Sequence, residues 1–298
     1  MAAPVEESEP KPLPVRGSKP LRIGIVGFGN LGKHLARKAS ESESLELAFV
    51  WNRDGSKMDS TDWLPATAIL SELEDFASRR PELVVEVAHP SVTAEHAKDF
   101  LAVCPFAIGS PTALADEALL EEVERLSFRR GVYVPTGALW GAQDIRGMDS
   151  LGTLRGLRVT MAKTPESFRL SEPLRSRLES ASPLTSATTL YEGSVSDLCP
   201  LAPNNVNAMA VAALAARDTL GFRKVVGRLV ADPGLSGWHR VEVEVRGEAG
   251  FEVRTVRMNP AAEGAVTGKG TYDSFWKSLL SASALVSAYG PHPGIHIV

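Results

Sequence analysis

Three glycines near the amino end of the chain stand at a spacing that can bind a dinucleotide. Gly27, Gly29 and Gly32 form a Gly-x-Gly-x-x-Gly pattern directly after a short apolar run. In such a turn the first glycine permits a tight bend and the second lets backbone approach a pyrophosphate; the third lets a helix pack close to the strand. Free N–H groups at the start of that helix, at Asn30 and Leu31, would bind the phosphates.

The end of the second predicted strand bears on which dinucleotide is used. Enzymes specific for NAD usually place an acid there to bind the ribose 2′-hydroxyl, whereas an arginine suits a 2′-phosphate. Here the strand runs into Asn52 and Arg53. We therefore expect NADP to be accepted, with NAD as the alternative if Arg53 is solvated and Asp54 folds back to the ribose.

A histidine follows the fourth predicted strand. In a doubly wound sheet ligands lie outside the carboxyl ends of the strands. Ala88, His89 and Pro90 are therefore expected to line the nicotinamide side of the crevice. His89 could take part in chemistry, but a role in ordering the turn or in touching the cofactor ribose is the favoured interpretation.

The elements that position these residues alternate between strand and helix in the first half of the chain. Such alternation is typical of an α/β Rossmann fold, a doubly wound parallel sheet. Strands are predicted over 23–26, 45–51, 63–69 (weakly), 82–88, 106–110 and 131–135, and helices over 96–103 and 112–126.

Beyond residue 154 the hydrophobic pattern changes to an alternation of apolar and polar side chains. Such alternation predicts a second, α+β domain with a largely antiparallel sheet backed by helices. Strands are predicted over 155–163, 188–193, 224–232, 238–245 and 251–257, with a helix over 205–216 that begins at an asparagine pair suited to capping. The expected organisation is a disordered tail (1–20), a dinucleotide-binding domain (21–140), a substrate domain (141–270) and a C-terminal helix returning to the first domain (271–298).

Composition narrows the class of protein. The chain has 298 residues, a formal net charge of −4 and only two cysteines. The negative net charge argues against a nucleic-acid partner, and no apolar run has the length of a membrane span. The low number of cysteines favours a reducing compartment, so we expect a cytoplasmic protein. No metal is expected, because the spacing of the remaining histidines with acids and cysteines matches no metal site.

Several motifs occur in an order that resembles the L-aspartate dehydrogenase family. They are Val-Glu-Val-Ala-His-Pro (85–90), Gly-Ser (109–110), Thr-Gly-Ala-Leu (136–139), Asn-Val-Asn (205–207) and Ala-Asp-Pro with Trp-His (231–239). The resemblance implies oxidation of L-aspartate to iminoaspartate with NAD or NADP, and hydrolysis to oxaloacetate and ammonia. It implies that Ala138 and Asn205 contact the nicotinamide cofactor, that His239 is catalytic and that the protein is a homodimer.

The chemistry of His239 agrees with that implied role. Amine oxidation needs a group that takes a proton from the substrate ammonium, and histidine titrates in the right range. The alternative is a surface or structural histidine at a strand start. A dicarboxylate substrate also needs cations, for which Lys163 and Arg169 are the candidates, a solvated surface cation being the alternative for each.

Three segments depart from the family pattern. Asn52-Arg53 replaces the acidic strand end, Trp140 places a bulky ring in a turn of small residues, and residues 261–268 are longer and richer in glycine. Two other functions stay open: a dehydrogenase of another amino or hydroxy acid, and a cofactor-binding sensor with little catalysis.

Overall fold

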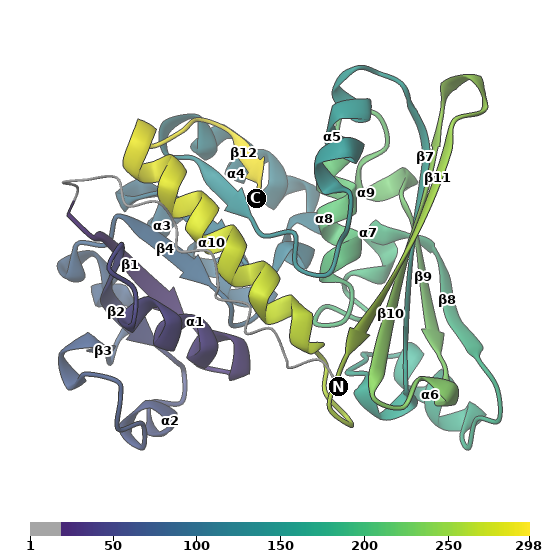
Figure 1. Ribbon diagram of the computed structural model, residues 1–298, viewed down its shortest axis with the longest axis horizontal. Helices are drawn as coiled ribbons and strands as arrows, with labels where there is room; N and C mark the ends of the chain where they lie inside the picture. The colour runs from purple at the N-terminus through teal and green to yellow at the C-terminus, as the bar shows by residue number, and fades with distance from the viewer. Residues whose placement is uncertain (1–18) are drawn as a thin grey trace, which may run out of the picture.

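The computed structural model describes residues 19–298, so most of the predicted tail lies outside the described residues. Within that range the chain forms two sheets with helices around them (Figure 1). The first sheet has seven parallel strands in the order β12-β6-β5-β4-β1-β2-β3. They are β1 (Leu21–Val26), β2 (Leu45–Trp51), β3 (Ile69–Leu70), β4 (Leu83–Glu86), β5 (Phe106–Ile108), β6 (Val132–Val134) and β12 (Ile295–Ile297).

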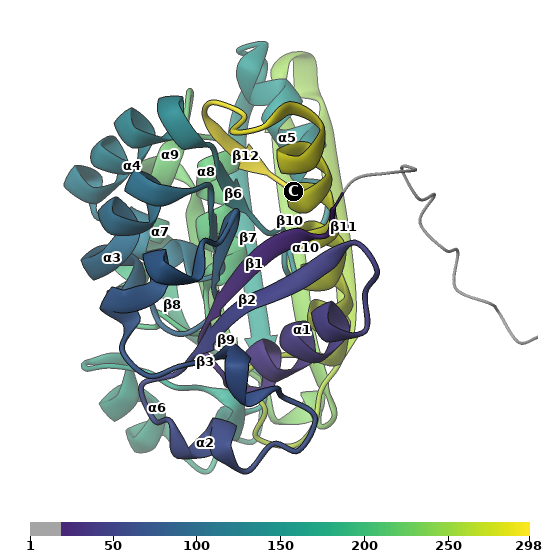
Figure 2. The same ribbon diagram turned by 90° about the vertical axis from the view of Figure 1, so that its left-hand side faces the viewer.

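Helices cover both faces of this sheet, which confirms the predicted Rossmann-type α/β fold. Figure 2 shows α1 (Asn30–Ser40) and α10 (Lys269–Tyr289) on one side, and α3 (Pro90–Val103) and α4 (Glu117–Arg130) on the other. On the α10 side, Phe275 and Leu279 join Ile23 and Leu35 in one buried apolar cluster. The C-terminal helix therefore packs on the first sheet, and its first residues contact the edge of the second sheet.

The second sheet has the order β11-β10-β7-β9-β8 and is antiparallel except for the β7–β9 pair, as predicted. Its strands are β7 (Leu154–Lys163), β8 (Thr188–Ser194), β9 (Val226–Ala231), β10 (Trp238–Gly247) and β11 (Glu252–Pro260). Figure 1 shows α5 (Ala142–Ser150), α7 (Val195–Leu198), α8 (Asn207–Ala215) and α9 (Gly221–Lys224) on its inner side. Residues 208–215 of α8 are all buried, as expected of a helix that is apolar all round.

Two local predictions were wrong, and one strand was not predicted. The strand expected over 63–69 is mostly turn and a 3-10 helix (Ala66–Ala68), because Pro65 cannot donate to a strand ladder. Helix α8 begins at Asn207, and the side chain of Asn205 does not cap it. Strand β12 was not predicted. Its apolar residues are few and its place depends on pairing with β6.

The helix expected over 112–126 divides in two. Residues Pro111–Ala115 form a 3-10 turn, and α4 then starts behind Asp116, whose carboxylate accepts a hydrogen bond from the Leu119 N–H. No helix among residues 19–298 combines the length and apolar character needed to cross a bilayer.

Candidate active site

One row of side chains crosses the end of the second sheet. Asn259 on β11 pairs with His239 on β10, and Lys163 on β7 pairs with Ala231 on β9. Between β10 and β7, Arg240 pairs with Ala162; continuing that antiparallel register by one residue places Lys163 opposite His239. Directly opposed residues have Cβ atoms about 4.5–5.5 Å apart, so two basic side chains lie next to each other on the same face.

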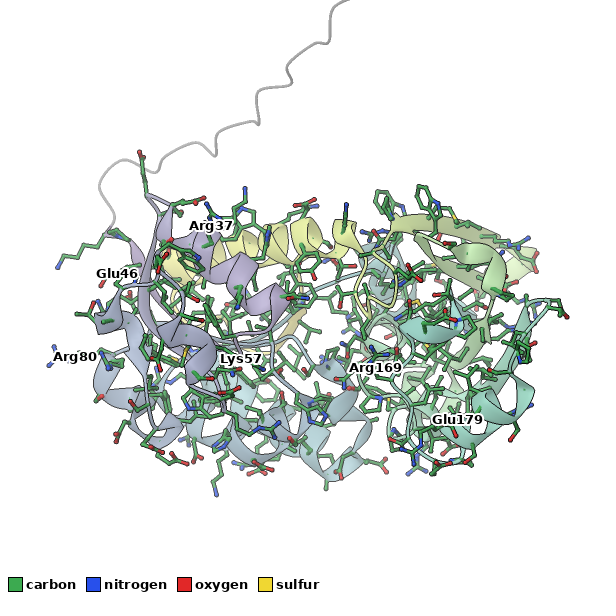
Figure 3. All side chains as sticks on the ribbon, turned by 90° about the horizontal axis from the view of Figure 1, so that it is seen from below. Arg37, Glu46, Lys57, Arg80, Arg169 and Glu179 are labelled. Carbon is green, nitrogen blue, oxygen red and sulfur yellow. The ribbon has the colours of Figure 1, made fainter. Side chains whose placement is uncertain are left out.

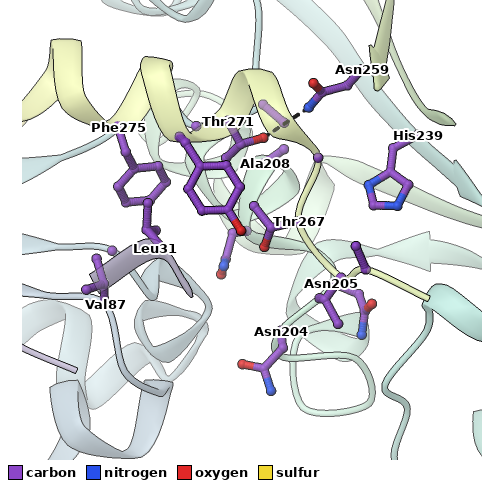
Figure 4. Close-up of a pocket in the computed structure, with 18 of the residues that line it drawn as sticks. Leu31, Val87, Asn204, Asn205, Ala208, His239, Asn259, Thr267, Thr271 and Phe275 are labelled. Atoms are coloured by element: carbon purple, nitrogen blue, oxygen red, sulfur yellow. Dashed lines mark hydrogen bonds between the residues drawn. The ribbon is translucent and has the colours of Figure 1, made fainter. Parts of the chain in front are cut away.

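This row forms one wall of a cleft of about 460 Å³ that both domains line. Figure 4 shows His239, Asn259 and Asn205 at one end, and Leu31 and Val87 of the first domain at the other. The cleft brings together predicted site residues that are far apart in sequence, namely Gly29, Asn30, Leu31, Ala88, Ala138, Lys163, Arg169, Asn205 and His239.

The glycine turn connects β1 to α1 at the first-domain end of the cleft. Gly27 has a left-handed φ of +111°, and a Cβ on Gly32 would lie 2.0 Å from the Gly27 carbonyl oxygen. These two glycines are needed by the turn itself. Gly29 is different: its φ is −73° and a Cβ there would have no neighbour within 4 Å. The open space above Gly29, at the N-terminus of α1, fits a pyrophosphate.

Lys163 is a buried cation, with only 2% of its surface exposed. Its Nζ donates to the Val266 carbonyl at 2.7 Å, and among residues 19–298 that is its one hydrogen bond. Burial, together with the nearby Arg169, lowers the pKa of Lys163 to about 7. A lysine ammonium has three donors, so the buried group retains hydrogen-bonding capacity on the cleft.

His239 is 4% exposed, and its Nε2 has no hydrogen-bond partner among the described residues. Burial is the main cause that lowers the pKa of His239 to about 4; the neighbouring Lys163 adds to it, and a backbone hydrogen bond at Ala265 opposes it. The imidazole is therefore neutral near pH 7 and can accept a proton. The pKa values of both basic groups in this row are therefore lower than they would be in water.

Asn205 lies where helix α8 approaches the cleft. Its Nδ2 donates to the Arg169 carbonyl at 2.6 Å, while its Oδ1 is buried without a partner in the described part of the chain. Asn207 also lines the cleft, and its Oδ1 is likewise buried without a hydrogen-bond partner among the described residues. Buried polar atoms are nearly always hydrogen-bonded, so these two acceptors fit a ligand that brings N–H donors.

Glu86 is a functional candidate that the sequence reasoning missed. Its side chain is fully buried at the end of β4, where burial raises its pKa and hydrogen bonds act in the opposite direction. It accepts five hydrogen bonds of 2.7–3.0 Å, from the N–H groups of Ala88, His89 and Ser110 and the hydroxyls of Thr93 and Ser110. Glu86 thereby fixes the two turns at Ala88 and Ser110 that line the cleft. The signal in the sequence was a charged residue inside an apolar strand.

Arg257 and Asn259 join the end of β11 to the first residues of α10. Arg257 donates to the carbonyls of Gly137 and Gly270, at 3.1 and 3.0 Å. Asn259 accepts from the Gly270 N–H at 2.9 Å and donates to the Thr271 hydroxyl at 3.1 Å. These bonds tie the second sheet to the turn beside Ala138, and sequence reasoning did not single out either residue.

Asn52, Arg53 and Asp54 follow β2 and lie outside the 460 Å³ cleft. Asn52 Oδ1 accepts from the Phe28 N–H at 3.0 Å, and its Nδ2 donates to the Asp54 carbonyl at 2.9 Å. The Asp54 carboxylate accepts from the Ser56 hydroxyl at 2.6 Å, which is the largest cause lowering its pKa. Asn52 thus braces the glycine turn, while the exposed Arg53 makes no side-chain hydrogen bond to another described residue.

Two expected site residues lie outside the cleft, and a third, Arg169, lines it with an exposed side chain. His89 and Pro90 are not in the lining of the cleft; the His89 ring caps α3 by accepting from the Ser91 N–H at 3.2 Å. Arg169 is exposed at the junction of the two domains (Figure 3) and donates to two carbonyls of its own segment. Among residues 19–298 no group of three metal-ligating side chains occurs.

Comparison with known proteins matches both parts of the chain. The family model described as "Homoserine dehydrogenase, NAD binding domain" matches residues 27–135, and the one described as "Aspartate dehydrogenase, C-terminal" matches residues 144–278. The first family match ends at residue 135 and the second begins at residue 144, between β6 of the first sheet and β7 of the second.

Individual relatives extend over most of the chain. The aspartate dehydrogenase domain-containing protein of Danio rerio is 48% identical over 267 residues, covering 88% of this chain and 95% of that protein. The L-aspartate dehydrogenase of Methanopyrus kandleri is 28% identical, over 79% of this chain and 87% of that one. The crystal structure of aspartate dehydrogenase from Thermotoga maritima has a TM-score of 0.64 at 22% identity, covering 90% of this chain and 97% of the other.

Proposed function

This chain belongs to the aspartate dehydrogenase family, and from that premise we propose that it oxidises L-aspartate to iminoaspartate with NAD or NADP. Water then converts iminoaspartate to oxaloacetate and ammonia. The observation that carries the proposal is the pairing of a buried lysine with a neutral histidine, Lys163 and His239, in the cleft of a dinucleotide-binding fold.

The glycine turn and the residues near Ala138 are suited to hold the cofactor at opposite ends of the cleft. The open position above Gly29 and the free N–H groups at Asn30 and Leu31 suit the pyrophosphate. The unpartnered Oδ1 of Asn205 suits the amide N–H of a nicotinamide. When bound, the nicotinamide ring would supply the hydride acceptor.

His239 would take the proton from the substrate ammonium. Its neutral imidazole has a free, buried Nε2, which is the state that a base needs before reaction. A carboxylate bound next to Lys163 would offset the positive charge that lowers the pKa of His239. Substrate binding would therefore increase the basicity of His239 at the moment when it is used.

Lys163 and Arg169 would bind the two carboxylates. Lys163 faces the cleft with no carboxylate partner among residues 19–298, and a buried cation is stabilised by an anion brought by the ligand. Arg169 lies at the mouth of the same cleft, where its guanidinium can bind a carboxylate in a bidentate way. Arg169 is near enough to Lys163 to lower its pKa, so the two cations are placed to bind the two carboxylates of one small substrate.

NADP acceptance is part of the proposal. Arg53 is exposed, and Asp54 is engaged by Ser56, so the end of β2 presents a free cation next to an occupied acid. We expect kcat/KM with NADP to equal or exceed that with NAD. Arg53→Glu should reverse the preference, and a strong NAD preference of the unaltered protein would contradict it.

A panel of L-amino and 2-hydroxy acids, followed by absorbance of the reduced nicotinamide, tests the activity. L-Aspartate should give the highest kcat/KM, and D-aspartate and L-alanine serve as controls for handedness and for the second carboxylate. A higher kcat/KM for another acid would show that this acid, and not L-aspartate, is the substrate. Cofactor binding without turnover of any acid would favour a sensor and reject the enzyme.

A further inference from the structure

Residues 261–268 run from the end of β11 to the start of α10 and line the substrate end of the cleft. Gly264, Ala265, Val266, Thr267 and Gly268 all belong to its lining, and Figure 4 shows Thr267 between α10 and His239. This glycine-containing segment supplies no side chain to the proposed reaction. Its backbone nevertheless contacts both basic groups of the site.

The backbone contacts come from two successive residues. The Val266 carbonyl accepts from Lys163 Nζ at 2.7 Å. A backbone hydrogen bond at Ala265 acts on His239 and favours its protonated form. The register of β10 against β7 places Lys163 next to His239, so two consecutive loop residues act on two adjacent side chains.

Asn259, the third residue of the row that contains Lys163 and His239, holds the C-terminal end of the segment in place. A Cβ on Gly268 would lie 2.5 Å from Asn259 Nδ2, and one on Gly270 would lie 2.9 Å from Asn259 Oδ1. The Asn259 hydrogen bonds to Gly270 and Thr271 need this close approach. At the near end, the Ala261 N–H donates to the Gly237 carbonyl at 2.9 Å, two residues before His239.

We propose that residues 261–268 form a positioning loop, in which the Val266 carbonyl holds Lys163 so that the remaining donors of Lys163, and its neighbour His239, face the substrate. The inference rests on the proposed function for what the two side chains do, and on the hydrogen bonds for how they are held. Lys163 uses one donor on Val266 and directs the other two into the cleft. The loop acts through these side chains and needs no contact of its own with substrate.

Loss of the carbonyl contact has a defined electrostatic consequence. A carbonyl that accepts from an ammonium favours the charged form. Arg169, which follows the 3-10 turn Pro165–Ser167, is the titratable group that acts on the pKa of Lys163, and His239 lies beside Lys163 on β10. Both are bases, so neither can replace the carbonyl. Displacement of the loop should therefore lower the pKa of Lys163 and weaken carboxylate binding.

Gly264→Ala is the test variant, because the loop holds its shape through a left-handed residue there. Gly264 has φ +66°, and a Cβ would meet only the Glu166 carbonyl oxygen, at 3.9 Å. Gly250→Ala is the matched control, since Gly250 has φ +80° with nothing within 4 Å and lies at the opposite end of the β10–β11 hairpin from His239. Both variants strain one backbone residue without a clash, and only the first is next to the site.

Two measurements on the full chain separate positioning from general damage. Succinate, a dicarboxylate without the amine, serves as the probe of carboxylate binding. We expect Gly264→Ala to weaken it by about tenfold or more, with Gly250→Ala unchanged and with equal affinity for the reduced cofactor in both. In a Lys163→Met background the Gly264→Ala effect should vanish, because the loop acts through Lys163.

The second measurement needs no substrate. With 13C-labelled lysine, the Lys163 side-chain NMR signal, assigned by its absence in Lys163→Met, should titrate at lower pH in Gly264→Ala than in the unaltered chain. Wild-type titration and wild-type succinate binding in Gly264→Ala would overturn the positioning role, as would additive effects in the double variant. A shifted titration without turnover of L-aspartate by the unaltered chain would keep the loop's role and reject the aspartate dehydrogenase activity.

Discussion

Lys163 and His239 lie next to each other across β7 and β10, and the pKa of each is lower than it would be in water. Burial acts on both, and the positive charge of Lys163 further lowers the pKa of His239. Two adjacent buried bases without a carboxylate between them cost stability. Such an arrangement is expected at a functional site, where stability is given up for binding or chemistry.

The first prediction is that Lys163→Met stabilises the protein and weakens dicarboxylate binding without abolishing it. The pKa of Lys163 is about 7 in the folded protein and near 10.5 when unfolded. The unfolded chain thus binds more protons between these values, and the cost of burying the charge is complete below pH 7 and shrinks as pH rises toward 10.5. Lys163→Met should gain on the order of 4 kcal/mol at pH 6 and less at pH 9.

Urea unfolding at the two pH values checks this prediction. Lys33→Met, which removes an exposed lysine from α1, is the control and should change stability little at either pH. Equal stability of Lys163→Met and the unaltered chain at pH 6 would show that the ammonium is not costly where it lies.

The second prediction concerns turnover. His239→Ala should lower kcat by about two to four orders of magnitude, the usual contribution of acid–base catalysis. Cofactor affinity should stay within about twofold, since the first domain supplies the pyrophosphate site. His89→Ala is the matched control, because the His89 ring caps α3 outside the cleft and its loss should affect stability more than rate. Near-normal turnover of His239→Ala would remove this residue from the mechanism.

The third prediction is a pH dependence of stability. The pKa of His239 is about 4 in the folded protein and 6.5 when free, so the unfolded state takes up this proton first as pH falls. Stability should therefore decrease from about pH 6.5 toward pH 4. His239→Gln removes the effect, and its loss of stability between pH 7 and 5 should be about 2 kcal/mol smaller than that of the unaltered chain. Parallel stability curves would contradict the buried, neutral imidazole.

The fourth prediction separates the glycines of the turn. Gly29→Ala should leave the melting temperature unchanged and weaken cofactor binding at least about tenfold, since the added Cβ meets no protein atom and would enter only the space that we propose for the pyrophosphate. Gly32→Ala should instead damage the fold, because its Cβ would lie 2.0 Å from the Gly27 carbonyl oxygen. Isothermal titration with the reduced cofactor and thermal melts distinguish the two. Unchanged affinity of Gly29→Ala would place the pyrophosphate elsewhere.

Local patterns in the sequence were sufficient for the parts of the fold that depend on local order. The buried strand before Gly27 and the alternation before Lys163 predicted two sheets of different type, and the structure has both. Pairings between distant segments could not be predicted this way. Strand β12 needs β6 beside it, and the opposition of Lys163 and His239 depends on the register of β7 against β10.

The side-chain partners were even less accessible from sequence. Asn205 was expected to cap a helix, but its amide is held by the Arg169 carbonyl, which comes from a segment 36 residues away. Asn52 was read for cofactor choice, and its carbonyl oxygen also holds the Phe28 N–H of the glycine turn. A residue type suggests a capacity for hydrogen bonding, and only the packed chain determines where that capacity is used.

The last prediction tests Glu86, whose carboxylate accepts five hydrogen bonds from the turns at Ala88 and Ser110 and from Thr93. Glu86→Gln replaces one acceptor oxygen with an NH2 group, which would face N–H and O–H groups that it cannot accept from. A buried donor left unsatisfied costs about 1–3 kcal/mol, so we expect a loss of about 2–4 kcal/mol in the free energy of unfolding. Since Ala88 and Ser110 line the cleft, the KM for the cofactor should also rise several-fold.

Glu82→Gln is the control. It alters an exposed carboxylate just before the same strand; this carboxylate accepts a hydrogen bond from the Arg22 N–H at 2.9 Å, and the substitution should cost little stability. Equal stability of the two variants would mean that the Glu86 carboxylate does not organise these turns.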